Sequence, residues 1–99
     1  MALEYQIKAR ARREIEKAAA WWAENRQSVP GAIRQDIEAA LKVLVQQPDL
    51  GTRVDTIRSG LVRRFLLIRT QYFLYYRVRR QILEVIAFWH ASRGTGPPL

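Results

Sequence analysis

The sequence predicts an α+β fold of the order β-α-α-β-β-β, with a helical hairpin packed on one face of a small, mainly antiparallel sheet. One segment near the N-terminus alternates apolar and polar side chains, and two longer segments then show helical periodicity. Residues 62–89 next read as three apolar strands separated by very short breaks. The sequence has 99 residues, 48% of them hydrophobic, which suits a single domain over residues 1–99 with a frayed tail at residues 94–99.

The first half of the sequence supplies one strand and two helices. Residues 3–9 alternate in polarity, as a short half-buried strand does. Residues 11–25 and 30–47 carry apolar side chains at helical spacing, and Pro30 suits the first turn of the second helix because an N–H is not needed there. The connection between the helices is short, so we expect them to lie antiparallel. Their apolar stripes are Ile15, Ala18, Ala19 and Trp22 in the first helix, and Ile33, Ile37, Leu41, Leu44 and Val45 in the second.

The second half of the sequence supplies three strands, expected at residues 62–69, 72–78 and 82–89. The short breaks between them favour hairpins and hence an antiparallel meander, whereas residues 49–60 are polar and irregular. Strict alternation predicts which side chains share a face of each strand. In the strand at residues 72–78, one face has Tyr72, Leu74, Tyr76 and Val78, and the other has Phe73 and Tyr75. In the strand at residues 82–89, one face has Ile82, Ile86 and Phe88, and the other has Leu83, Val85, Ala87 and Trp89. Both faces of the sheet are therefore apolar. Since one helical hairpin covers only one face, we expect a partner protein, rather than loops and the tail, to cover the other.

The formal net charge of +8 is concentrated in the second half of the sequence. Residues 1–50 hold eight basic and seven acidic side chains, while residues 51–99 hold nine basic and two acidic ones. All nine of these basic residues are Arg, whose planar guanidinium binds phosphate or carboxylate in a bidentate manner. The asymmetry favours a polyanionic partner, which is RNA, DNA or an acidic protein segment, over a merely solvated basic surface. We expect Glu84, the one acidic residue after Asp55, to pair with an Arg of a neighbouring strand.

The composition excludes cysteine-based sites and gives no support to metal or cofactor sites. The sequence contains no Cys, which excludes disulfides, thiol nucleophiles and thiolate metal sites. It shows no metal-binding spacing, glycine-rich phosphate loop or cofactor fingerprint, so we expect no metal and no cofactor. No apolar stretch is long enough to cross a bilayer, and we therefore expect a cytoplasmic protein without a membrane contact.

Five short motifs occur in a characteristic order. Residues 72–78 (YFLYYRV) resemble an aromatic strand of the form Y-x-I-x-Y-R-V, and residues 86–93 (IAFWHASR) resemble a closing I-x-x-x-H-x-x-R. Arg63-Arg64 opens a strand, residues 11–15 resemble the start of a first helix, and residues 47–51 resemble the P-x-x-G that follows a second. On these motifs the sequence resembles the RelE/ParE toxin superfamily, and more closely its ParE, or plasmid-stabilisation, branch.

This resemblance implies the toxin of a type II toxin–antitoxin system, which inhibits growth until an acidic, ParD-like antitoxin binds it in a hetero-oligomer. ParE-like members poison DNA gyrase, and RelE-like members cut mRNA in the ribosomal A site. The resemblance therefore implies gyrase inhibition first, with ribosome-dependent mRNA cleavage as the alternative. A third interpretation is a non-toxic member that serves as a transcriptional co-repressor together with its antitoxin.

Cleavage of mRNA would require an acid–base group and cations around a phosphate. His90 is the single His and its ordinary pKa suits proton transfer, while Arg63, Arg64 and Arg69 are the candidates for phosphate binding. The plain alternative for His90 is a structural ring that bonds to the backbone.

Gyrase inhibition would require a binding surface instead of an acid–base pair. Arg77 and Arg93 are the candidate target-binding residues. The candidates for antitoxin binding are Trp21, Phe73 and Tyr75, although Trp21 also suits the edge of the core.

Overall fold

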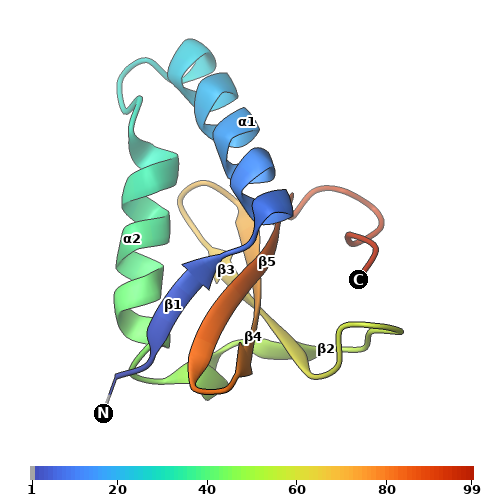
Figure 1. The fold of residues 1–99 in the computed structure, drawn as a ribbon. Helices are drawn as coiled ribbons and strands as arrows, with labels where there is room; N and C mark the ends of the chain where they lie inside the picture. Colours follow the sequence, from blue (N-terminus) through green and yellow to red (C-terminus); the bar gives the residue numbers. More distant parts are fainter. Residues whose placement is uncertain (1) are drawn as a thin grey trace.

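The structure confirms the predicted α+β class and order of elements, and it adds one short strand (Figure 1). It is a computed structural model that describes residues 2–99. The elements are β1 (Glu4–Ile7), α1 (Ala9–Asn25), α2 (Ala32–Leu44), the 3₁₀ turn η1 (Pro48–Leu50), β2 (Thr52–Val54), β3 (Val62–Leu67), β4 (Tyr72–Arg79) and β5 (Ile82–His90). The strands form one sheet in the order β1-β5-β4-β3-β2, in which β1 and β5 are parallel and the other neighbours antiparallel.

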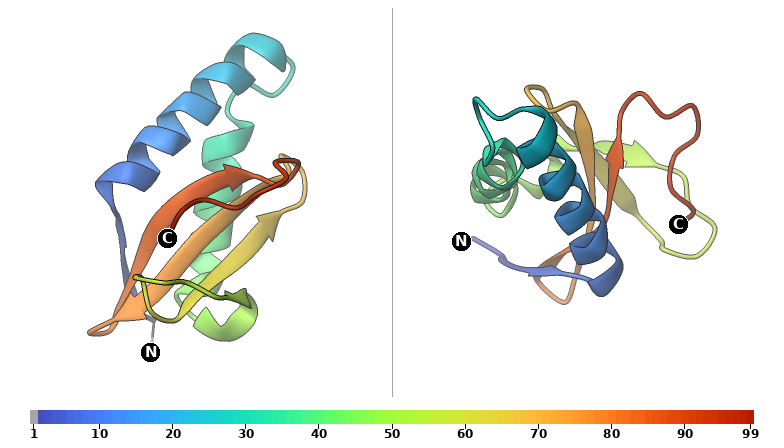
Figure 2. Two further views of the ribbon diagram at one scale, coloured as in Figure 1. Left: turned by 90° about the vertical axis from the view of Figure 1, so that its right-hand side faces the viewer. Right: turned by 90° about the horizontal axis from the view of Figure 1, so that it is seen from above.

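The two helices form one layer that covers a single face of the sheet (Figure 2). They run antiparallel, as predicted, and the Trp22 indole N–H donates to the Val29 carbonyl oxygen at 3.0 Å near their connection. The core between the layers contains Ala11, Ile15, Ala18, Ile33, Ile37, Ala40, Leu41 and Leu44 of the helices and Leu67, Leu74, Tyr76, Leu83, Val85 and Phe88 of the strands. Fully burying one large apolar side chain contributes roughly 1.5–3 kcal/mol, so this layer is the main source of stability.

The extra strand β2 lies in the stretch that the sequence predicts as irregular. It has three residues, too few to show alternation, and it pairs with the start of β3. A buried contact fixes the turn before it. The Tyr76 hydroxyl accepts a hydrogen bond from the Gly51 N–H at 2.9 Å and donates one to the Pro48 carbonyl oxygen at 2.6 Å. A Cβ atom at position 51 would lie 2.6 Å from that hydroxyl oxygen, so the close approach requires glycine.

A β-bulge at Ile86 changes the faces that strict alternation predicts. Residues 75–76 of β4 lie opposite Ala87 and Val85, so Ile86 is an extra residue in β5. Ile86 and Ala87 therefore both face away from the helices, and Phe88 returns to the helical side. The prediction that Ile86 and Phe88 share a face of the sheet is wrong, because strict alternation does not allow for a bulge.

The chain itself covers the buried cluster on the second face of the sheet, so the expectation that a partner protein covers this part is wrong, while Leu66 of the same face remains 36% exposed. The cover consists of the β2–β3 loop and the tail, residues 55–61 and 94–99, which lie opposite the helices (Figure 2). The tail does not hang free as a frayed end, since Pro97 is buried and the Trp89 indole N–H donates to the Thr95 carbonyl oxygen at 2.8 Å. The covered cluster contains Val62, Tyr75, Ile86 and Ala87, with Val54, Phe73, Trp89 and Leu99 packed against it.

Replacing Tyr76 with Phe should destabilise the fold, because the buried Gly51 N–H and the Pro48 carbonyl oxygen then lose their partner. We expect the free energy of unfolding, measured by urea denaturation, to fall by about 1–3 kcal/mol. The control is Tyr5→Phe, because the Tyr5 side chain is 56% exposed and should change that free energy by less than about 0.5 kcal/mol. Equal, small effects of the two variants would contradict the role assigned to the Tyr76 hydroxyl.

Candidate functional site

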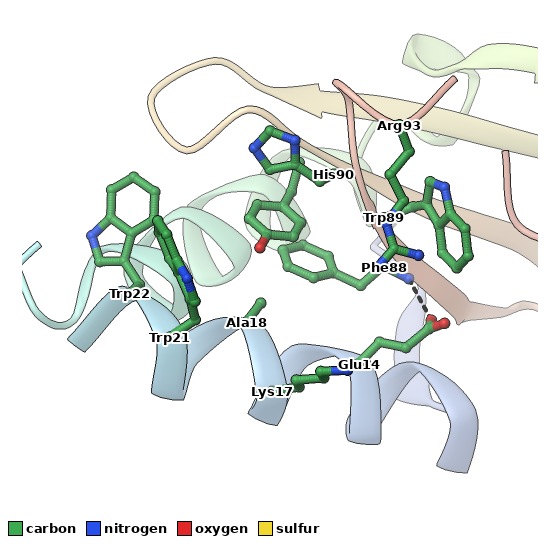
Figure 3. A pocket seen from close by; sticks show the side chains of 10 residues that line it. Glu14, Lys17, Ala18, Trp21, Trp22, Phe88, Trp89, His90 and Arg93 are labelled. Carbon is green, nitrogen blue, oxygen red and sulfur yellow. Dashed lines mark hydrogen bonds between the residues drawn. The ribbon is translucent and has the colours of Figure 1, made fainter. Parts of the chain in front are cut away.

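A cavity of about 440 Å³, which we call the aromatic cavity, lies between α1 and the ends of β4 and β5 (Figure 3). Its side chains combine aromatic rings with charges. They are Glu14, Lys17, Ala18, Trp21 and Trp22 of α1, Tyr72 of β4, Phe88, Trp89 and His90 of β5, and Arg93. Three of the residues singled out in the sequence, Trp21, His90 and Arg93, therefore meet here.

Helix α1 forms one wall of the aromatic cavity because polar contacts fix it on β5. The Glu14 carboxylate accepts a hydrogen bond from the Phe88 backbone N–H at 2.9 Å, and the Arg10 guanidinium donates to the same carboxylate at 3.3 Å. The following turns of α1 place Lys17 and Trp21 along the cavity (Figure 3). Trp21 is 47% exposed, so its ring is available to a partner.

Stacked rings form another part of the aromatic cavity. The Tyr72 and Phe88 rings lie parallel with centroids 4.6 Å apart, and the His90 ring meets Tyr72 edge-on at 4.9 Å. Burial raises the pKa of the Tyr72 hydroxyl, and the nearby Arg93 charge lowers it in part. The Tyr72 hydroxyl is therefore neutral at physiological pH and does not act as a base.

The contacts of His90 indicate a structural role for its ring. The Ser92 backbone N–H donates to His90 Nδ1 at 3.1 Å, and Ser92 Oγ lies 2.6 Å from the same nitrogen. Nδ1 therefore acts as an acceptor, and the neutral ring carries its proton on Nε2. Glu14, the acidic residue of the aromatic cavity, is already engaged by the Phe88 amide. The cavity thus lacks a free carboxylate to pair with His90 in acid–base chemistry.

Two cations of the aromatic cavity form no salt bridge within residues 2–99. Arg93 lies over the Trp89 ring, 4.1 Å from its centroid, and Lys17 stands on the α1 wall. A guanidinium over an indole ring is held in place by a cation–π interaction but keeps its N–H donors for other groups. The cavity therefore suits an apolar side chain that is flanked by carboxylates.

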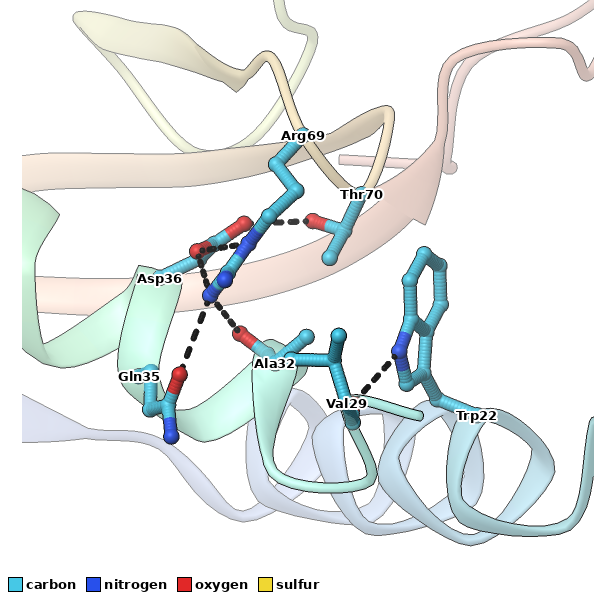
Figure 4. A network of polar contacts seen from close by, with 7 residues as sticks. All are labelled: Trp22, Val29, Ala32, Gln35, Asp36, Arg69 and Thr70. Atoms are coloured by element: carbon cyan, nitrogen blue, oxygen red, sulfur yellow. Dashed lines mark hydrogen bonds and ion pairs between the residues drawn. The ribbon is translucent and has the colours of Figure 1, made fainter. Parts of the chain in front are cut away.

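Arg69 anchors the β3–β4 turn to α2 instead of facing His90 (Figure 4). Its Nε donates to Asp36 Oδ1 at 3.0 Å, and its Nη2 donates to the Ala32 carbonyl oxygen at 3.3 Å. The buried Thr70 hydroxyl donates to the other Asp36 oxygen at 3.2 Å. Because both carboxylate oxygens are occupied, the network holds two elements together and leaves Arg69 little freedom to bind a phosphate.

Arg63 and Arg64 also lie away from the aromatic cavity. Arg63 donates to the Gly51 carbonyl oxygen at 2.8 Å and so stabilises the turn before β2. The Arg64 guanidinium lies over the Phe73 ring on the second face, 4.1 Å from its centroid. The structure therefore does not bring the three candidate phosphate-binding arginines together with His90.

Arg77 fastens the cover of the second face. Its Nε donates to the Glu84 carboxylate at 2.8 Å, and its Nη1 donates to the Ser59 carbonyl oxygen of the β2–β3 loop at 3.2 Å. The predicted pairing of Glu84 with an Arg of a neighbouring strand is confirmed. The Arg77 side chain is 17% exposed, which leaves it a small surface for contact with a target protein.

The candidate antitoxin-binding residues lie on two different faces. Trp21 is accessible beside the aromatic cavity, whereas Tyr75 is 2% exposed beneath the cover of the second face. Phe73 is half-buried under the Arg64 guanidinium. Contact of Tyr75 with another protein therefore requires the cover to move, whereas part of Phe73 stays exposed beside the Arg64 guanidinium.

Glu14 and Lys17 line the aromatic cavity, although the sequence does not single them out. Both lie on the α1 face of Ala18 and Trp21, at spacings of three and four residues, and this spacing was the available signal. The signal is weak because most exposed helix positions are charged whether or not they line a site.

Within residues 2–99, no group of three or more His, Asp or Glu side chains is placed to hold a metal ion. No helix in the same range combines the length and apolar character needed to cross a membrane.

Comparisons with known proteins identify relatives of this fold. The family model for the ParE toxin of type II toxin–antitoxin systems, parDE, matches residues 5–94. A solved structure of the chromosomal ParDE toxin–antitoxin system from P. aeruginosa is similar, with a TM-score of 0.70 and 16% sequence identity over 92% of this chain and 98% of that chain. No curated protein matches the sequence.

Replacing Glu84 with Gln should lower stability in a pH-dependent manner. The hydrogen bond from Arg77 holds the pKa of Glu84 below its ordinary value of 4.5, against the opposing effect of burial. The folded state therefore favours the ionised carboxylate, so this stabilisation is present above that ordinary value and is lost as the pH falls through the folded-state pKa.

We expect Glu84→Gln to lower the free energy of unfolding at neutral pH and to converge with the unmodified protein in acid, as measured by urea denaturation across a pH series. The control is Glu38→Gln, because that carboxylate is 73% exposed in its pair with Lys42. A difference between Glu84→Gln and the unmodified protein that stays constant with pH would contradict this account.

Proposed function

The chain belongs to the ParE toxin family of type II toxin–antitoxin systems, and from this premise we propose that it inhibits DNA gyrase and is neutralised by an acidic, ParD-like antitoxin. The observation that carries the proposal is the match of the ParE toxin model over residues 5–94. The geometry around His90 supports a protein that acts by binding, because the ring is engaged at Nδ1 and has no free carboxylate beside it. Gyrase acts on DNA in the bacterial cytoplasm, so the proposal also locates the toxin there.

Ribosome-dependent mRNA cleavage receives less support from the contacts of the arginines. Cleavage requires cations that are free to surround a phosphate. Arg69 is engaged by Asp36, and Arg63 is engaged by the Gly51 carbonyl oxygen. Neither lines the cavity that contains His90.

The aromatic cavity is the surface that we propose for the antitoxin. Trp21 offers an exposed ring, and Lys17 and Arg93 offer positive charge next to it. An acidic protein segment could insert an apolar side chain between the rings while its carboxylates pair with the two cations. Tyr75 would take part only if the cover of the second face were displaced.

Purified protein should inhibit supercoiling of relaxed plasmid by bacterial DNA gyrase, and His90→Gln should inhibit it to the same extent. The reason is that a binding protein does not need the proton chemistry of an imidazole. The parallel control is a cell-free translation reaction, in which mRNA should stay intact. Uninhibited gyrase together with cut mRNA, and loss of that cleavage in His90→Gln, would establish the nuclease alternative. Inactivity in both assays, with unimpaired growth on expression, would indicate a non-toxic co-repressor.

Replacing Trp21 with Ala should weaken binding of the acidic antitoxin that we propose. Large rings at the centre of an interface often contribute 2 kcal/mol or more, so we expect about a thirtyfold or greater loss of affinity by calorimetry. The control is Val43→Ala on α2, because Val43 is 42% exposed and lines none of the described cavities. Equal affinities of the two variants would place the antitoxin on another face.

A further inference from the structure

A second cavity, of about 540 Å³, carries a concentration of positive charge and lies beside the tail. We call it the basic cavity. Its cations come from three separate parts of the chain: Lys8 and Arg10 at the start of α1, Arg58 in the β2–β3 loop and Arg77 of β4. Pairing of β4 and β1 with β5 brings Arg77 close to Lys8 through Glu84, and the β2–β3 loop adds Arg58. The function proposed above makes no use of this cavity.

The cations of the basic cavity outnumber the carboxylates that contact them. Glu84 is shared by Arg77, at 2.8 Å, and Lys8, at 3.8 Å. Arg10 pairs with Glu14 at 3.3 Å. Arg58 forms no salt bridge within residues 2–99, and both Arg58 and Lys8 are exposed. Two side-chain carboxylates thus contact three of the four cations, and the side chains of the cavity keep a net positive charge.

We propose that the basic cavity binds phosphate groups of the backbone of double-stranded DNA. Arg offers paired N–H donors that match two phosphate oxygens, and Lys adds a mobile point charge. Contacts of this kind are independent of sequence and position a protein on a duplex. The toxin would accordingly have a DNA contact of its own, which does not require gyrase.

The surroundings of the basic cavity favour a duplex over a single strand. Proteins that bind single strands stack bases on free aromatic rings. Here the Trp89 ring lies under Arg93, the Phe73 ring lies under Arg64, and Tyr75 is buried. Among residues 2–99, no ring on this face is fully open for stacking, so a backbone contact is the mode that the face supports.

The same surroundings favour DNA over an acidic peptide. A bound peptide gains most of its affinity by burying apolar side chains in a groove. The apolar cluster of this face is already closed by the tail, whose Leu99 packs on it. Ile57 is 95% exposed at the edge of the basic cavity, but one apolar side chain gives a peptide little surface to bury.

The test uses the full-length chain and a fluorescein-labelled duplex of about twenty base pairs, with anisotropy measured over a series of salt concentrations. We expect a linear loss of log affinity with log salt. The double variant Lys8→Gln/Arg58→Gln should bind more weakly and reduce the magnitude of the salt slope by about 2, since each lost phosphate contact removes about 1. Both residues are exposed, so the fold should persist, which urea denaturation checks.

The matched control is Arg34→Gln/Lys42→Gln, which removes the same charge from exposed positions of α2 on the helical side of the sheet. This variant should keep the salt slope of the unmodified protein. A single strand of the same length should bind more weakly than the duplex, and polyglutamate should not displace the duplex.

Three results would overturn the proposal: no binding of the duplex at low salt, an equal change of slope in the control variant, or binding of polyglutamate as tight as that of the duplex. Because the assay contains no gyrase, its failure would leave the proposed gyrase inhibition standing, and failure of gyrase inhibition would leave the DNA site standing.

Discussion

The structure depends on one constraint, which is that a sheet with apolar side chains on both faces has a single layer of helices. The helical side is filled in the ordinary way by the stripes of α1 and α2. The other side is partly closed by a loop and a tail that have no regular structure of their own. The bulge at Ile86 turns two consecutive apolar side chains toward that cover, and Arg77 ties the loop to the sheet through the Ser59 carbonyl oxygen. The position of the basic cavity follows from this arrangement.

The excess of arginine has two separate uses in this protein. Arg63, Arg69 and Arg77 donate to backbone carbonyl oxygens or carboxylates and hold turns and loops in place. Arg58 and Arg93 form no salt bridge within residues 2–99 and remain available to an anion. Net charge alone therefore indicates a polyanionic partner but does not locate its site. Each cavity contains at least one cation that forms no salt bridge within residues 2–99: Arg58 in the basic cavity, and Lys17 and Arg93 in the aromatic cavity.

The fold was predictable because helices and long strands carry periodic patterns, and the five motifs occur in family order. Three features escaped prediction for physical reasons. The strand β2 is too short to show alternation of apolar and polar side chains. The bulge at Ile86 interrupts the alternation of β5, and no residue type in the sequence marks it. The tail is held by a hydrogen bond from the Trp89 indole to a backbone carbonyl oxygen, which no side-chain pattern reveals. The contacts of the candidate phosphate-binding arginines could not be predicted from sequence either. The carboxylate that engages Arg69 is Asp36, which lies 33 residues earlier in the chain.

The exchange rate of the Trp89 indole proton tests most directly whether the tail closes the second face. This proton donates to the Thr95 carbonyl oxygen at 2.8 Å, whereas the Trp21 indole is exposed and has no such partner among residues 2–99. Solvent exchange can be followed by NMR in the full-length chain, with the three indole signals assigned by Trp→Phe variants. A seated tail predicts exchange at Trp89 slower than at Trp21 by about tenfold or more. Equal exchange rates at the two indoles would show that the tail leaves the face open and would contradict the account.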